Sequence, residues 1–158
     1  MDQVSLDLEE PFKAFTVRSD NLSNRIVSKA KVCGAYDPEN PPVDLPEARE
    51  VDALWDTGAT STVISERITG ELGLIPIGKI IMTHANGQDI CDTFLVNIQL
   101  PSQLDLTGVT VTASKLSDID MLIGMDIICM GDLALTNKGS RTCFSFRVPS
   151  KEEIDYTE

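Results

Sequence analysis

The sequence predicts an all-β fold built of short strands, with one or two small helices. Hydrophobic and polar residues alternate in several short runs, most clearly at 25–32 and 108–114, and this period of two is typical of half-buried strands. Asn86-Gly87 lies between two further strand-like runs, and this dipeptide favours a β-hairpin. Aromatic residues make up only 5% of the chain, so we expect a core of Ile, Val and Leu.

The expected elements follow one another along the whole chain. Strands are expected at 15–17, 25–32, 51–55, 63–64, 77–84, 90–100, 108–114, 120–124, 132–136 and 142–148. One helix is expected at 65–72, with Ser65 as its N-cap and Gly73 as its stop, and a second, brief helix has Asp126 as its cap. The stretch 37–50 contains four prolines among acidic residues, which predicts an exposed loop because proline cannot donate to a strand ladder.

A length of 158 residues predicts one domain with a core of its own. We expect a flexible acidic arm at 1–12 and a folded domain at 13–150, with its core at 50–148. The polar residues 151–158 should form a frayed tail.

Composition and charge exclude several classes of function. The net charge of −12 disfavours nucleic acid as a partner, because binding to phosphates requires clustered basic residues. The chain shows neither a secretory signal nor an apolar run long enough to span a bilayer, so we expect a cytoplasmic protein without a membrane partner. One histidine and four scattered cysteines without a C-x-x-C pair predict reduced thiols, no metal site and no cofactor.

The sharpest chemical feature is Asp56-Thr57-Gly58, which directly follows the apolar strand at 51–55. Hydrolysis of a peptide bond without a metal ion or a covalent intermediate needs a general base and a general acid side by side. Two carboxylates that share one proton supply both, because like charges about 3 Å apart cannot both ionise. Such three-residue motifs also occur by chance in turns, but the apolar strand before this one favours a catalytic Asp56.

Two segments together resemble the retropepsin-like, or retroviral-type, aspartic proteases. Residues 54–64, Leu-Trp-Asp-Thr-Gly-Ala-Thr-Ser-Thr-Val-Ile, are similar to the active-site segment of that family, and 120–126, Asp-Met-Leu-Ile-Gly-Met-Asp, are similar to its second signature. The predicted hairpin within 80–98 lies where the family has its flap. The resemblance covers 50–148 and implies the acid-protease fold, a closed β-barrel with short helices, whereas residues 1–50 have no assigned counterpart.

The resemblance also implies roles for the residues of the active-site segment. Asp56 would be the catalytic carboxylate, and the hydroxyl of Thr57 would reach across to a partner subunit. Gly58 and Thr60 would present backbone groups to the bound peptide. Family members with Asp in the place of Thr60 use its carboxylate on the substrate backbone, and this chain departs from that pattern.

The remaining expected site residues surround that loop. Gly124 would pack beneath it, and Asp126 would cap the helix behind it. Ala59 and Ile123 would support the loop as well. The substrate would be covered by the flap, whose residues His84, Asn86 and Gly87 are expected to bind it.

The chain contains a single Asp-Thr-Gly and no Asp-Ser-Gly. One chain therefore brings one carboxylate to the catalytic pair, and a twofold axis past Asp56 would supply the other. We expect a homodimeric aspartic endopeptidase that acts on a polypeptide substrate. The alternative is a catalytically silent module of the same fold that binds peptides or forms dimers, because a fold does not secure a function.

Overall fold

The computed structural model describes residues 11–158, so most of the arm expected at 1–12 lies outside the described residues. The strands are β1 (Lys13–Arg18), β2 (Val27–Gly34), β3 (Ala48–Trp55), β4 (Val63–Ser65), β5 (Gly78–His84), β6 (Gly87–Leu100), β7 (Leu104–Ser114), β8 (Met121–Ile123), β9 (Asp132–Thr136) and β10 (Cys143–Val148). The helices are α1 (Glu66–Glu71) and α2 (Met125–Ile128), with 3₁₀ turns η1 (Pro101–Gln103) and η2 (Lys138–Ser140). The predicted all-β fold with short helices is confirmed.

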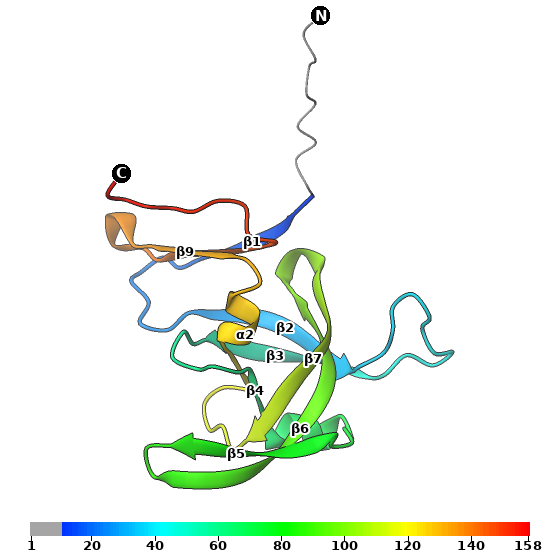
Figure 1. Ribbon diagram of the computed structural model, residues 1–158. Coiled ribbons are helices and arrows are strands. Elements are labelled where there is room, and N and C mark those ends of the chain that lie inside the picture. Colours follow the sequence, from blue (N-terminus) through cyan, green and yellow to red (C-terminus); the bar gives the residue numbers. More distant parts are fainter. Residues whose placement is uncertain (1–10) are drawn as a thin grey trace, which may run out of the picture.

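Six strands close into a barrel in the order β2-β3-β8-β4-β7-β6, and a pairing between β2 and β6 completes the ring. β3 runs parallel to β8 and β4 runs parallel to β7, whereas the other neighbours are antiparallel. β5 pairs only with β6. The β5–β6 hairpin therefore projects from the barrel wall (Figure 1).

A second, three-stranded sheet in the order β1-β10-β9 lies over one end of the barrel (Figure 1). Its inner face contributes Phe15, Phe144 and Phe146, which pack around Trp55 at the end of β3. The ring centroids of Phe146 and Phe144 lie 4.8 Å and 5.0 Å from that of Trp55. The indole N–H of Trp55 donates to the Ser28 hydroxyl at 2.9 Å, so the residue before Asp56 is anchored by both sheets.

The barrel wall follows the predicted alternation in β2. Ser28, Ala30 and Val32 are buried, while Lys29 and Lys31 point outward and are exposed. Because of this alternation, only strand residues two apart share a face of the sheet.

Two local predictions need correction. The expected loop at 37–50 is wrong over its last three residues, because β3 begins at Ala48 and pairs there with Cys33 of a longer β2. The predicted hairpin is confirmed, but its two-residue turn is Ala85-Asn86, since His84 pairs with Gly87. Gly87 follows the turn at φ 137°, a backbone region that glycine adopts more readily than other residues.

Residues 149–152 are attached to the three-stranded sheet through one carboxylate. Asp132 accepts hydrogen bonds from the Ser150 hydroxyl, the Lys151 N–H and the Arg147 guanidinium. These three donors, in that order, hold the pKa of the Asp132 carboxyl well below its usual range. Within residues 11–158, no helix has the length and apolar character needed to cross a bilayer.

Candidate active site

Asp56 lies directly after β3, between two neighbouring segments of the barrel. On one side the N–H of Trp55 donates to the carbonyl of Ile26 at 2.8 Å, and on the other the N–H of Asp56 donates to the carbonyl of Ile123 at 2.9 Å. Because neighbours on both sides hold the backbone here, the position of Asp56 is determined by the barrel. Its side chain is half-buried, whereas the next two residues are exposed.

The loop after Asp56 holds the carboxylate itself. Its Oδ1 atom accepts a hydrogen bond from the N–H of Gly58 at 2.9 Å, and the N–H of Ala59 donates to the backbone carbonyl of Asp56 at 3.2 Å. A Cβ atom at Gly58 would lie 3.1 Å from Oδ1, so a side chain there would crowd the carboxylate. Oδ2 makes no hydrogen bond with any residue of 11–158, which leaves it available to a second acid or a water molecule.

Gly124 packs directly beneath this loop. A Cβ atom at Gly124 would lie 2.6 Å from the carbonyl carbon of Ser61 and 3.0 Å from the carbonyl oxygen of Ala59. The N–H of Met125 donates to the same Ala59 oxygen at 2.8 Å. The segment 120–126 therefore contacts the segment 54–64, and the role of Gly124 as an active-site support stays a prediction.

Thr62 and Asp126 lock these two segments together. The Thr62 side chain is fully buried; its N–H and hydroxyl donate to the two Asp126 carboxylate oxygens at 2.9 and 2.8 Å. The Thr62 hydroxyl oxygen in turn accepts the N–H of Gly124 at 3.2 Å. The sequence analysis did not single out Thr62, although a hydroxyl residue between the Asp-Thr-Gly and a buried strand is a signal for such a brace.

The predicted capping role of Asp126 is wrong. The N-cap of α2 is Gly124, two residues earlier, and no side chain caps the helix. Asp126 lies inside the first turn, where Oδ1 accepts the N–H of Ile127 at 2.9 Å while both oxygens hold Thr62. The carboxylate thus joins the helix to the active-site loop, and Asp126 stays a candidate support residue.

The flap residues expected to bind substrate lie at the tip of the β5–β6 hairpin. This hairpin and the β3–β4 loop that carries Asp56 project toward the same side of the barrel, on the left of Figure 1. At the tip, His84 Nε2 lies 3.0 Å from Asp89 Oδ2, and the N–H of Asn86 donates to His84 Nδ1 at 3.2 Å. His84, Asn86 and Gly87 are exposed, and their role in binding stays a prediction, as does that of the exposed Thr60.

Two isoleucines of the hairpin were missed by the sequence analysis. Ile81 and Ile90 are cross-strand partners and are 67% and 73% exposed, although apolar side chains gain from burial. Ile90 lies on the same face of β6 as Phe94 and Val96 of the barrel core, because strand side chains alternate. His84 lies on the opposite face of the hairpin. The isoleucine pair is therefore an apolar face of the flap without a covering partner among residues 11–158.

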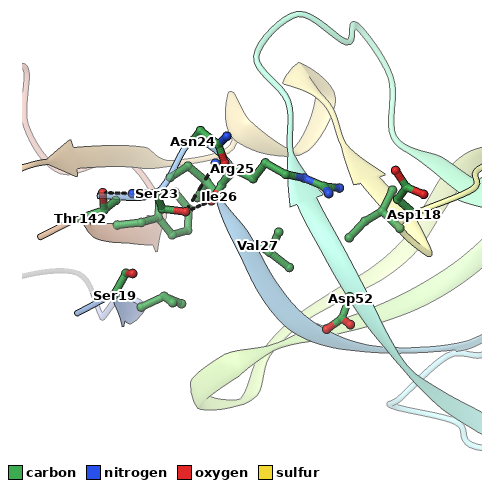
Figure 2. Close-up of a pocket in the computed structure, with 12 residues that line it drawn as sticks. Ser19, Ser23, Asn24, Arg25, Ile26, Val27, Asp52, Asp118 and Thr142 are labelled. Carbon is green, nitrogen blue, oxygen red and sulfur yellow. Dashed lines mark hydrogen bonds between the residues drawn. The ribbon is translucent and has the colours of Figure 1, made fainter. Parts of the chain in front are cut away.

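A cavity of about 510 Å³ borders the Asp56 strand. Figure 2 shows Arg25 extending across it toward Asp118, with Val27 and Asp52 below and Ser19 and Thr142 at the far end. The register pairs Val27 with Leu54, and continuing it places Arg25 opposite Asp56 on the same outward face. Asp56 itself does not line the cavity.

The chemistry available at this loop is that of one accessible carboxylate on a fixed backbone. No group of three His, Cys, Asp or Glu side chains within residues 11–158 is arranged to hold a metal ion. A second carboxylate beside Oδ2 would complete an acid–base pair. Because the sequence has one Asp-Thr-Gly, another copy of the chain as the source of that second carboxylate stays a prediction.

The fold is similar to the crystal structure of a retropepsin-like aspartic protease from Rickettsia conorii, at 12% identity and a TM-score of 0.52, over 87% of this chain and 96% of that one. Weaker similarities are to the solution structure of the Simian Foamy Virus (mac) protease, at 16% identity and a TM-score of 0.45 over 65% of this chain and 91% of that one, and to the foamy viral protease-reverse transcriptase bound to an RNA/DNA hybrid, at 24% identity and a TM-score of 0.41 over 50% of this chain and 10% of that one. No curated protein matches the chain.

A family model described as "gag-polyprotein putative aspartyl protease" matches residues 47–129, which is more than half of the chain. That range contains both the Asp56 loop and the Gly124 turn that supports it. The resemblance to retropepsin-like proteases is thereby confirmed. The chain belongs to the gag-polyprotein aspartyl protease family and has the retropepsin-like fold.

Proposed function

We propose that this protein is an aspartic endopeptidase whose catalytic pair forms across a homodimer, with one Asp56 from each chain. The observation that carries the proposal is the Asp56 carboxylate: one oxygen is held by Gly58 at 2.9 Å, and the other makes no hydrogen bond within residues 11–158. The alternative, a silent module, needs no such carboxylate.

In the proposed reaction the two Asp56 carboxylates share one proton. The ionised one accepts a proton from a water molecule, which attacks the carbonyl carbon of the scissile peptide bond. The protonated one donates to the carbonyl oxygen, and the resulting tetrahedral intermediate collapses as the amine leaves with a proton. In each chain the Gly58 N–H keeps the Asp56 carboxyl group oriented during both proton transfers.

The substrate would lie as an extended strand between the Asp56 loops and the two flaps. The exposed Ile81 and Ile90 supply an apolar face for it, and Gly58 leaves room for its backbone. The exposed Thr57, whose hydroxyl makes no hydrogen bond within residues 11–158, is free to reach the partner subunit as the resemblance implies.

The first test is hydrolysis of a mixed peptide library by the purified protein and by Asp56→Asn. The amide is nearly isosteric but cannot act as a base, so kcat should fall roughly a thousandfold or more while the thermal unfolding curve stays the same. A statine-type inhibitor should block the wild type. Binding of peptides without any cleavage by the wild type would instead support the silent module.

The second test asks whether the catalytic pair spans two chains. Wild-type protein is mixed with an equal amount of Asp56→Asn at constant total concentration, and the chains are allowed to exchange. A pair built from two chains leaves about one quarter of the activity, whereas chains that act alone keep about one half. A residual activity of one half, or activity proportional to concentration where light scattering detects only monomer, would refute the dimeric site.

A further inference from the structure

A second cavity, of about 300 Å³, collects three basic side chains at one end of the three-stranded sheet. Arg18 ends β1 opposite Cys143, and Lys138 and Arg141 flank the η2 turn that joins β9 to β10. Gly139 and Ser140 close this turn with left-handed φ values of 67° and 58°. Residues that lie far apart in the sequence are thus brought around one hollow.

The basic side chains of this cavity are not neutralised. Arg18, Lys138 and Arg141 form no ion pair with any residue of 11–158, although acidic residues outnumber basic ones by 25 to 13 in the sequence. Asp20 is the only carboxylate among the residues that line the cavity. A local excess of positive charge in a protein of net charge −12 attracts an anionic group.

The basic cavity adjoins the cavity beside Asp56. Ser19 and Thr142 line both, and Figure 2 shows them at the end remote from Asp118. Thr142 is buried and fixed by the Ser23 N–H at 2.9 Å and the Asn137 carboxamide oxygen at 2.8 Å. The two cavities therefore adjoin at a fixed point, and we call them together the track. Arg25 and Ile26 line its larger part beside the backbone that carries Asp56, because the Trp55 N–H donates to the Ile26 carbonyl, although Asp56 itself lines neither cavity.

We propose that this track is an extended substrate-binding site, and that its basic end, formed by Arg18, Lys138 and Arg141, selects polypeptides with an acidic segment away from the cleaved bond. The inference rests on the proposed endopeptidase function, because it names the class of substrate for that site. The proposal is supported by the excess of positive charge among the residues that line the basic cavity.

The order of charges along the track sharpens the proposal. Asp118 and Asp52 line the end of the track away from Thr142, whereas the strand register places Arg25 opposite Asp56. Arg25 crosses the middle, and the basic cavity lies beyond Thr142. The preferred substrate therefore carries its acidic segment on the side of the cleaved bond that faces the basic cavity.

Binding is measured separately from catalysis, with Asp56→Asn protein and fluorescence anisotropy of labelled peptides. One peptide series carries a Glu block at increasing separation from a constant apolar centre, on either side, and a matched series carries Gln instead. At one separation the Glu peptide should bind about tenfold more tightly, since several exposed charge pairs each contribute modestly. High salt should abolish this preference.

Removing positive charge from the cavity should raise the Kd of the Glu peptide, and removing negative charge should lower it. Lys138→Gln combined with Arg141→Gln should remove most of the preference, and Asp20→Asn should strengthen binding. Lys31→Gln is the matched control, because Lys31 is an exposed lysine that lies outside both cavities. An equal effect of Lys31→Gln would show attraction by net charge alone and would overturn the proposal.

The same substitutions are then made in the active protein. Lys138→Gln with Arg141→Gln should raise KM for the Glu peptide and leave both kcat and the Gln peptide unchanged. Binding without hydrolysis of any peptide would refute the endopeptidase function but leave the acidic-segment site standing. Hydrolysis with equal kcat/KM for Glu and Gln peptides at every separation, or tighter binding of an RNA oligonucleotide than of the Glu peptide, would refute the site.

Discussion

The two parts of the candidate active site are held in place to very different degrees. The Asp56 loop is held by contacts with the segment around Gly124. Thr62 is fully buried and donates to both carboxylate oxygens of Asp126. Gly124 leaves no space for a side chain beneath the loop. The β5–β6 hairpin depends on its own cross-strand pairing. Its isoleucines Ile81 and Ile90 remain exposed.

This difference shows which part of the site one chain can complete alone. A carboxylate with the proposed catalytic role must be held close to its productive geometry, and the barrel fixes the backbone of Asp56 within one chain. In the proposed enzyme the hairpin would act as a flap that admits a polypeptide and then covers it, so we expect its apolar face to stay open until substrate or a second chain arrives. We therefore expect substitutions beneath the Asp56 loop to lower the stability of the protein, and substitutions in the flap to weaken substrate binding.

The largest expected effect is on the rigid part, in Gly124→Ala. The new Cβ would lie 2.6 Å from the backbone of Ser61, which neither segment can avoid without displacing the Asp56 loop. We expect the free energy of unfolding to fall by about 3 kcal/mol and hydrolysis to be lost. Urea denaturation and the peptide assay measure the two effects.

Gly70→Ala is the control for that substitution. Gly70 lies within α1, and a Cβ there meets no atom within 4 Å. Alanine should leave hydrolysis unchanged and stabilise the protein by about 0.5–1 kcal/mol. If both glycine variants had the same stability, the brace beneath Asp56 would not be a tight contact.

A smaller effect is expected on the flap, in the double variant Ile81→Thr and Ile90→Thr. Because both side chains are exposed, the free energy of unfolding should change by less than about 0.5 kcal/mol. KM should rise severalfold, since the apolar cover over the substrate is lost. Ile80→Thr, on the opposite face of the hairpin, serves as the control and should leave KM unchanged.

The smallest expected effect is the loss of stability at acid pH that depends on Asp132. It should change neither the Asp56 loop nor the flap. The donors around Asp132 lower the pKa of its carboxyl below the ordinary value, so this carboxylate stabilises the fold above about pH 4 and ceases to do so as pH falls through the lowered value. Asp132→Asn should have a lower Tm than the wild type at pH 6, and the two Tm curves should converge at low pH. Parallel curves would show that Asp132 does not contribute through its charge.

Much of this protein could be predicted from its sequence because the relevant signals are local. Alternation along 25–32 gave the correct inward face of β2, and the dipeptide at 86–87 gave the hairpin to within one residue. The Asp-Thr-Gly and the later Ile-Gly were assigned to one site because both short motifs resemble the retropepsin-like proteases, and the family model covers both of them. Strand propensity and turn chemistry act over a few residues, so a sequence displays them directly.

Other features were decided only by the tertiary structure, because they depend on contacts between distant residues. The first fifty residues had no assigned counterpart, yet β1 pairs with β10 and β2 closes the barrel. Asp126 binds Thr62, 64 positions away, where a local helix cap was expected. Arg18 and Arg141 reach one cavity only because β1, which ends at Arg18, pairs with β10, which begins two residues after Arg141. The pairing and register of the strands determine which distant residues come into contact, and no local sequence pattern encodes which strands will pair.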